Sequence, residues 1–438
     1  MNILVAGAGH GGLVAAGLLA RQGAQVTVVE RGREETLGHD WTDIFNLASF
    51  REAGIPMPEP GQFHPACSMT FFNPSCTAGF ASYVPPEECT ESTMERREIL
   101  RRLVAFAREG GARLRFETEV AGPIVENNRV AGLAVRNPAQ VQDLTADLVI
   151  DAAGMNSPVR RQLPHHFGIV REFRRDQYFT AFRAFYQHTG ARPLGDPFSV
   201  YFFPLKRQAV SWIAREGEYV DLMCGSFVNT SQNYAEEVRQ SLLPRHPEMG
   251  DQILRGGQVR NIPVRRPISL MVANGYAAVG DAAGMTVPII GAGICNSIRA
   301  GRLLAETIQK NPLTDFSVAE LWPYQVNYMR QYGAVHASLD VLKGFLLALK
   351  PASLDYIFEH KLLEDGDLIK ARTGQEMRFS LPELAVRGVR GASRAPILQS
   401  MAAKLAASQL LKYHALAIPS RYEPNAVRVW GKIYDGIK

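Results

Sequence analysis

Several features are missing from this 438-residue sequence, and each absence excludes a class of protein. It contains no run of eighteen apolar residues, so no transmembrane helix is predicted. It begins with a strand-like run and not a charged, Leu-rich leader, so no signal peptide is predicted. The five cysteines, at 67, 76, 89, 224 and 295, form no CxxC pair, which argues against a zinc site or an iron–sulfur cluster. We therefore expect a reduced, cytoplasmic protein with no metal site.

The overall composition is that of an ordinary globular protein, with 46% hydrophobic and 21% charged residues. A chain of this length predicts two or three domains, because one core rarely grows so large. The net charge of +5 is uneven: residues 367–438 hold twelve Lys/Arg and five Asp/Glu, a net of +7. Such a region could face an anionic membrane or an acidic partner, or could be a solvated helical face. Aromatic residues are too sparse there to support nucleic-acid binding, and none is predicted.

The first thirty-one residues carry a dinucleotide-binding pattern in its full context. An apolar run at 3–6 predicts a strand, residues 13–20 predict a helix of small side chains, and residues 25–29 predict a second strand. Between the first strand and the helix lies a G-x-G-x-x-G motif. The cofactor-binding candidates here are Gly7, Gly9, His10, Gly11, Gly12, Glu30 and Arg31.

Each part of this pattern has a physical reason. Gly7 permits a tight turn, Gly9 lets a pyrophosphate approach the backbone, and Gly12 lets helix and strand pack closely. The N–H groups at the start of the helix attract phosphate. Glu30 follows Gly12 by eighteen residues, close to the ~20 expected for the acid that binds ribose hydroxyls. The segment therefore predicts the binding site for one end of a dinucleotide.

A second glycine-bearing segment lies about 250 residues further on. Residues 277–284 predict a strand that ends in a turn, and residues 296–307 predict a long helix. Asp281 at the strand end could accept hydrogen bonds from sugar-like hydroxyls, and the N–H groups of 291–294 could stabilise negative charge on a ring carbonyl. The string Asp-Ala-Ala-Gly-Met occurs at both 151–155 and 281–285, so we expect two strand ends that converge on one ligand.

The remaining patterns predict an α/β fold with three regions. A Rossmann-like domain is expected from 1–60, 90–165 and 275–330. A substrate domain with an antiparallel sheet is expected from 61–89 and 166–274, and a helical C-terminal region from 331–438. Residues 44–53 predict a helix, and residues 113–150 predict an antiparallel meander. His39, Asp40 and Trp41 are expected in a loop near the cofactor, where the first two could donate protons or cap the next helix.

Three separated motifs resemble the FAD-dependent oxidoreductases of the p-hydroxybenzoate hydroxylase fold. They are the N-terminal fingerprint, the turn at 151–161 and the segment at 280–296, and the resemblance covers roughly residues 1–330. Within that fold the chain resembles the geranylgeranyl reductase family. Gly280-Asp281-Ala282-Ala283-Gly284, followed by Pro288 and Gly291-Ala292-Gly293-Ile294, is similar to the GDAAG…P…GGGI pattern of the reductases.

The resemblance implies FAD as the cofactor and assigns roles to further residues. It implies that Glu30 binds the adenosine ribose, that Arg96 contacts the phosphates and that the Val120 backbone contacts the adenine. Asp281 would bind the ribitol, and the amides of Ala292, Gly293 and Ile294 would lie near the isoalloxazine. Gly154 and Gly280 complete the cofactor-binding set. An aromatic strand ending in Phe203-Pro204 would line the substrate pocket, together with Tyr201 and the loop at 39–41.

Two departures from the family patterns bear on function. Ala153-Gly154 stands where the hydroxylases carry Asp-Gly, and that Asp helps them bind NAD(P)H. Ser199 and Tyr201 replace the Tyr and Trp that the reductases carry before Phe-Pro. The first departure argues against direct binding of NAD(P)H. The second means that the family's lipid substrate is not established for this chain.

The resemblance implies a reductase that transfers hydride from reduced flavin to a C=C bond of an apolar, isoprenoid-like substrate. Electrons would come from an external donor, NAD(P)H or ferredoxin, since the sequence has no second G-x-G-x-x-G. The catalytic acid stays unassigned among His39, Asp40 and Tyr201. The alternatives are an aromatic or quinone monooxygenase of the same fold and a non-catalytic prenyl-binding escort. The basic C-terminal region could hold the enzyme peripherally on a membrane surface.

Overall fold

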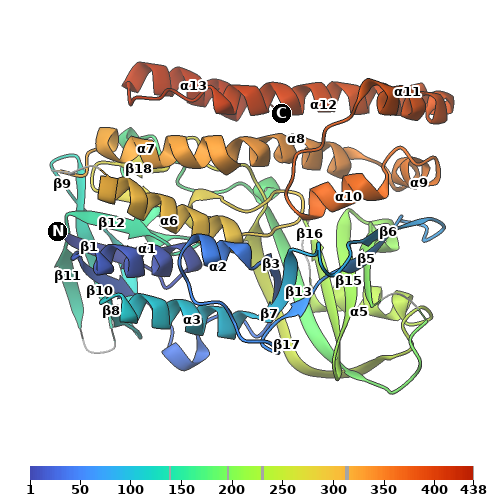
Figure 1. Cartoon of the computed structure of the whole chain (residues 1–438), viewed down its shortest axis with the longest axis horizontal. Helices are drawn as coiled ribbons and strands as arrows, with labels where there is room; N and C mark the ends of the chain where they lie inside the picture. Colours follow the sequence, from blue (N-terminus) through green and yellow to red (C-terminus); the bar gives the residue numbers. More distant parts are fainter. Residues whose placement is uncertain (138–139, 195–196, 228–230, 311–314, 438) are drawn as a thin grey trace.

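Two sheets and a stack of helices organise the chain (Figure 1). The structure is a computed structural model that describes residues 1–437 apart from 138–139, 195–196, 228–230 and 311–314. A parallel sheet lies near one end of the molecule, a larger sheet lies near the other, and helices form layers along one long side. The sheets and helices give the mixed α/β architecture that the sequence predicts.

The N-terminal strands form a six-stranded sheet in the order β18-β19-β12-β1-β2-β8. All neighbours pair in parallel except β18 and β19. The strands are β1 (Asn2–Ala6), β2 (Gln25–Val29), β8 (Arg113–Arg115), β12 (Leu148–Asp151), β18 (Val272–Ala273) and β19 (Tyr276–Ala278). The apolar run of β1 is fully buried because this sheet is covered on both faces, as parallel sheets are.

Small residues let the helices of this half pack very closely. Helix α1 (His10–Arg21) lies between α3 (Arg96–Glu109) and α6 (Ile294–Lys310). A Cβ atom at Gly11 would lie 2.4 Å from the Ser297 carbonyl oxygen, and one at Gly301 would lie 2.2 Å from the Gly11 carbonyl oxygen. Backbone therefore meets backbone where α1 crosses α6, and no larger residue fits at this crossing.

The larger sheet has seven strands in the order β17-β13-β16-β15-β14-β5-β6. They are β5 (Ser68–Phe72), β6 (Gly79–Tyr83), β13 (Tyr178–His188), β14 (Phe198–Phe202), β15 (Ala209–Glu216), β16 (Tyr219–Ser226) and β17 (Met249–Pro263). Alternate side chains of the sheet pack on α5 (Gln232–Leu242) on one face. The opposite face turns toward the parallel-sheet half and the C-terminal helices.

Two small sheets complete the strands and correct two expectations. One holds β9 (Glu119–Glu126), β10 (Arg129–Arg136) and β11 (Val141–Thr145), and the other holds β3 (Thr42–Asn46), β4 (His64–Pro65) and β7 (Glu91–Glu95). The helix predicted over 44–53 is wrong in its first part, because β3 pairs with β7 and only α2 (Ala48–Glu52) is helical. The meander predicted from 113 is wrong for β8, which joins the parallel sheet.

The C-terminal region is helical and lies in two layers above the sheets (Figure 1). Its helices are α7 (Val318–Tyr328), α8 (Ala334–Ala348), α9 (Pro351–Glu359), α10 (Asp365–Arg372), α11 (Leu381–Arg390), α12 (Ala395–Leu416) and α13 (Pro424–Gly436). A π-helical turn, Met329–Gly333, joins α7 to α8. Within the described residues no single helix is long and apolar enough to cross a membrane. One pair bent by 112°, Val318–Ala348 with Pro351–Glu359, passes that test by length and composition.

The glycine crossing makes a prediction about stability. Gly11→Ala should lower the free energy of unfolding by about 1–3 kcal/mol, because the new methyl group overlaps the α6 backbone. Gly344→Ala in α8 is the matched control, since its Cβ would meet no atom within 4 Å. That control should be neutral or stabilising by about 0.4–1 kcal/mol. Chemical denaturation of both variants measures the difference, and equal effects would contradict the packing argument.

Candidate functional site

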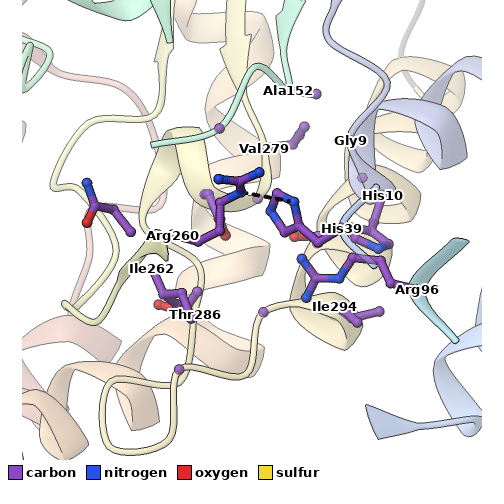
Figure 2. Close-up of a pocket in the computed structure, with 18 of the residues that line it drawn as sticks. Gly9, His10, His39, Arg96, Ala152, Arg260, Ile262, Val279, Thr286 and Ile294 are labelled. Carbon is purple, nitrogen blue, oxygen red and sulfur yellow. Dashed lines mark hydrogen bonds between the residues drawn. The ribbon is translucent and has the colours of Figure 1, made fainter. Parts of the chain in front are cut away.

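A cleft opens where the strands of the parallel sheet end. Because β1, β12 and β19 run parallel and adjacent, their carboxyl ends share one edge of the sheet. Both Asp-Ala-Ala-Gly-Met strings follow these ends and contribute residues to the cleft. Figure 2 shows the lining residues, drawn from segments that are far apart in the sequence. They include Gly9, His10, Gly11, His39, Trp41, Arg96, Ala152, Gly154, Arg260, Gly280, Asp281, Thr286, Gly291, Gly293, Ile294 and Ser297.

The glycine fingerprint forms one wall of this cleft. Gly9, His10 and Gly11 line it, and the first-turn N–H groups of α1 have no partners within their own helix. Gly7 (φ +87°) turns the chain away from β1. A Cβ at Gly9 would lie 2.7 Å from the Ala152 carbonyl oxygen, and one at Gly12 would lie 2.5 Å from the Ala152 Cβ. The protein itself therefore requires glycine at these positions.

The acidic residue of the fingerprint is fixed beside this turn. The Glu30 carboxylate accepts hydrogen bonds from the backbone N–H of Ala8 at 2.9 Å and of Gly32 at 2.7 Å. Arg31 is exposed next to it. Val120 lies on β9, close in sequence to Thr118, whose N–H donates to the Glu30 carbonyl oxygen at 2.9 Å. These residues form the outer end of the predicted dinucleotide site.

The opposite end of the cleft is built by residues 280–297. Burial raises the pKa of the Asp281 carboxyl to about 6, and the nearby Arg96 guanidinium opposes this shift. Gly291 has φ +71°, and the N-terminus of α6 begins at Ile294, so first-turn N–H groups border the cleft here. Ala292 does not line the cleft; its side chain packs with an apolar cluster that includes Val287 and Leu339.

A partly buried cation lies between the two ends. Arg96 donates from Nε and Nη2 to the Asp43 carboxylate at 2.5 and 2.6 Å, and its guanidinium lies 5.6 Å from the centre of the Trp41 ring. The His10 Nε2 atom is buried near this pair and has no hydrogen-bond partner. Burial and the charge of Arg96 lower the pKa of His10 to about 4. The imidazole is therefore neutral at pH 7 and can hydrogen-bond a ligand without adding charge.

Of the three loop residues 39–41, two line the cleft and one does not. His39 and Trp41 line the cleft, with ring centres 5.0 Å apart. Burial lowers the pKa of His39 to about 4, and Arg260 Nε donates to its Nδ1 at 3.3 Å (Figure 2). Nδ1 is thus the acceptor, which leaves the imidazole proton on Nε2. Asp40 does not line the cleft; its carboxylate lies 3.3 Å from Arg255 Nη2.

The three residues predicted at the end of the aromatic strand lie outside the cleft. The Tyr201 hydroxyl is 2.7 Å from His246 Nε2, on the face of the large sheet that α5 covers. Burial raises the pKa of this hydroxyl to about 12. Phe203 is buried in an apolar cluster with α9 and α10, and the Pro204 carbonyl accepts a hydrogen bond from Tyr234 at 3.4 Å. The structure does not bring these residues to the cofactor cleft.

Three cleft residues were not predicted from the sequence, and only one of them had a signal that could have been used. Arg260 lies near the C-terminal end of β17, and nothing in the sequence pattern marks it. Thr286 follows the second Asp-Ala-Ala-Gly-Met string directly, and its Oγ1 donates to the Pro263 carbonyl. Ser297 lies in the first turns of α6, beside Gly280. Adjacency to the repeated string was the one available pointer, and it applies to Thr286 alone.

A buried arginine links the large sheet to the loop that borders the cleft. Arg183 donates to Asp221 at 2.6 to 3.1 Å and to the Thr42 carbonyl, and both charged side chains are less than a tenth exposed. Trp212 Nε1 donates to the same carboxylate at 3.1 Å. Removing one partner of such a pair costs several kcal/mol, because it leaves a buried charge unpaired. The pair therefore fixes how β13 faces the loop that carries Trp41.

The donors and acceptors of the cleft fit a dinucleotide cofactor. Its fingerprint end offers unpaired first-turn amides and a fixed carboxylate, while His10 leaves a buried nitrogen unsatisfied. Gly154 has φ +82°, and a Cβ there would meet no atom within 4 Å, so the backbone is open to a ligand. Among the described residues, no group of three or more His, Cys, Asp or Glu side chains is placed to hold a metal ion.

Comparison with known proteins agrees with this geometry. Residues 1–181 match the FAD binding domain family. The chain is 23% identical to the digeranylgeranylglycerophospholipid reductase of Sulfolobus acidocaldarius, over 100% of this chain and 97% of that protein. Among solved structures, it is similar to a geranylgeranyl bacteriochlorophyll reductase-like protein from Thermoplasma acidophilum. That match has a TM-score of 0.72 and 20% identity, and covers 92% of this chain and 98% of the other.

A structure of another catalytic type is less similar. A probable FAD-dependent monooxygenase from Pseudomonas aeruginosa matches with a TM-score of 0.58 and 19% identity, over 82% of this chain and 99% of that one. The fold, the FAD cofactor and the resemblance to the reductases are thus all confirmed. Over its whole length the chain is therefore similar to geranylgeranyl reductase-like FAD-dependent oxidoreductases, and its N-terminal part matches an FAD-binding family.

Proposed function

We propose that the protein is an FAD-dependent reductase of C=C bonds in an isoprenoid chain. The observation that carries this proposal is an apolar layer that begins at the cleft. Val287 lies between the cleft residues Thr286 and Gly291, and it packs with Leu339 and Leu342 of α8. One turn further along α8, Phe345 joins the apolar cluster of the large sheet. Helix α8 thus contributes to both apolar clusters, and an apolar substrate that reached the reactive end of the cofactor would lie beside them.

The large sheet supplies the other side of this layer. Val200 and Phe202 of β14 and Val210 and Trp212 of β15 project to the face opposite Tyr201. They pack in one cluster with residues of α8, α9 and α10. A flexible prenyl chain suits such a surface, because burying apolar area gains about 25 cal/mol per Å² without requiring directed contacts.

Different cleft residues would bind different parts of FAD, which supplies hydride when it is reduced. In this proposal the Glu30 carboxylate accepts from the adenosine ribose, and the first-turn amides of α1 bind the diphosphate. Asp281 accepts from the ribitol hydroxyls. The amides at 293 and 294 stabilise negative charge on the ring, as preorganised donors do. His39, with its proton on Nε2, is the neutral donor on the cleft wall that we favour as a source of the second hydrogen.

Electrons must come from outside the chain in this proposal. The sequence has no second dinucleotide fingerprint, and Ala153 replaces the Asp that binds NAD(P)H in the hydroxylases. NAD(P)H docking transiently or a reduced ferredoxin would supply them. We also propose that the protein meets its lipid substrate at a membrane surface, on which the basic C-terminal region would lie.

The proposed reaction has a direct test. The FAD-loaded protein, reduced anaerobically with dithionite, should add two hydrogen atoms per reduced bond to a geranylgeranyl lipid, as mass spectrometry would detect. Unreduced holoprotein is the control and should leave the lipid mass unchanged. A reduced holoprotein that leaves the lipid intact would contradict the proposal. Oxygen uptake with NADPH that an aromatic compound stimulates would favour a monooxygenase.

Two substitutions test where the proton comes from. Tyr201→Phe should change turnover by less than about twofold. Tyr201 lies on the face of the large sheet that α5 covers, so this substitution removes no group from the cleft. His39→Phe should lower turnover by about 10²–10⁴, the usual range for a lost acid–base group. Steady-state kinetics of both holoproteins, matched for FAD content, measures this. The reverse pattern would place the proton donor on the α5 side.

Asp281 makes FAD affinity depend on pH. Because the pKa of its carboxyl is raised to about 6, it is ionised above that pH and accepts hydrogen bonds best there. The dissociation constant for FAD should rise as the pH falls through about 6, by up to about tenfold per pH unit. Asp281→Asn should bind FAD more weakly and lose this dependence. Flavin fluorescence titrations measure both, and identical pH profiles would contradict the assignment.

A further inference from the structure

Helix α11 is an amphipathic helix whose apolar side faces outward. Leu381 is 82% exposed and Val389 is 79% exposed, while Leu384 and Val386 are about half exposed. Its buried residue is a cation, Arg387. Surface helices of globular proteins normally turn the apolar stripe to the core and the charges to solvent. Helix α11 does the reverse, so its outward face lacks a partner within the described chain.

The outward face carries no charge. At about 100° per residue, an arc of roughly 200° runs from Leu384 through Leu381, Ala385 and Val389 to Val386. Glu383, Arg387 and Arg390 all project from the remaining part of the helix circumference. Apolar and charged residues are therefore fully separated around α11. The sequence shows this separation once the bounds of the helix are known.

Specific ion pairs hold α11 in this orientation. Arg387 Nη1 donates to Asp367 at 2.6 Å and to the Leu362 carbonyl at 3.1 Å, with both side chains less than a tenth exposed. Arg390 Nη1 donates to Glu364 at 2.6 Å. Ser380 and Glu383 form a capping box at the N-terminus. The charged side is thus satisfied on α10 and the loop before it, which leaves the apolar side free.

The exposed apolar side chains continue along the same outer layer. Figure 1 shows α11, α12 and α13 as one row along the outer edge of the molecule. Eight of the large hydrophobic residues exposed in the described chain belong to these three helices. They are Leu381, Leu384, Val386, Val389, Leu410, Tyr413, Val429 and Ile433.

The net charge of the α11–α13 region indicates what binds the apolar face of α11. From residue 377 to the end, the sequence has ten Lys/Arg and three Asp/Glu, a net charge of +7. A second copy of the chain on a twofold axis would bring this positive region against itself. Four large side chains on ten residues also fall short of the roughly 20–30 residues that a stable protein interface takes from each side. An anionic lipid surface complements both the apolar face and the charge.

We propose that α11 lies in the interface of an anionic membrane, with Leu381, Leu384, Val386 and Val389 inserted among the lipids. This inference rests on the proposed function, since the substrate is a lipid. It goes beyond a basic tail held by charge alone, because it assigns binding to a particular apolar face. Arg387 and Arg390 dock α11 on α10 and the loop before it, and α9 and α10 cover the apolar layer of the large sheet. Membrane binding would therefore bring that layer next to the lipid.

Vesicle flotation of the FAD-loaded protein tests this inference. Wild-type protein should float with vesicles of phosphatidylglycerol and phosphatidylcholine. The double variant Leu381→Gln/Val389→Gln should bind at least about tenfold more weakly, because it removes the two most exposed anchors of α11. Val141→Gln on β11 is the matched control, with a side chain 70% exposed on the other half of the molecule, and it should bind like wild type. FAD content confirms that each variant is folded.

The same proteins separate this inference from the proposed reaction. The double variant should still reduce geranylgeranyl lipid dispersed in detergent, where docking is not needed. Wild-type protein that reduces dispersed lipid but does not float would overturn membrane docking and leave the reaction standing. Wild-type protein that floats but reduces no lipid would support docking and overturn the reaction. A dimer in solution that the double variant abolishes, without vesicle binding, would identify a second copy as the occupant.

Discussion

The close approach of backbone to backbone between three distant segments is the constraint on which the rest of the structure depends. Gly9 and Gly12 lie against Ala152, and Gly11 lies against α6 at Ser297. Any side chain at these glycines would push apart the ends of β1 and β12 or the crossing of α1 and α6. The cleft exists because these ends stay together. The same small residues therefore serve packing and leave first-turn amides open to a cofactor.

Polar side chains surround the cofactor end of the cleft, and apolar side chains surround the region beyond it. The cofactor end holds paired charges, Arg96 with Asp43 and Arg183 with Asp221, together with neutral histidines. Beyond residues 286–292, the contacts become aliphatic and aromatic along α8 and one face of the large sheet. This order suits an FAD whose nucleotide end is held by polar groups and whose ring borders an apolar substrate. An outward apolar helix at the end of the layer suits a substrate that resides in lipid.

Local patterns predicted the fold and the cofactor well, because the fingerprint and the 280–296 segment carry their own context of strand, glycine turn and helix. They failed where a partner distant in sequence decides the outcome. Residues 42–46 became a strand because β7 pairs with them. Alternation along β14 puts Ser199 and Tyr201 on one face, yet only the packing of α5 decides that this face turns away from the cleft. Periodicity marks α11 as amphipathic, and only its ion pairs with Asp367 and Glu364 reveal that the apolar side faces outward.

In the proposed reaction, hydride passes from the flavin in the cleft to a C=C bond of a lipid that lies in the apolar layer beside α8. A crystal structure of the FAD-loaded protein with a bound geranylgeranyl lipid tests it most directly. We predict one FAD extending from Glu30 to the 291–294 turn, with a lipid double bond about 3–3.5 Å from its ring. The lipid chain should lie between α8 and the side chains of Phe202 and Trp212. A lipid bound beside Tyr201 and His246, on the α5 side of the sheet, would contradict the proposed site of hydride transfer.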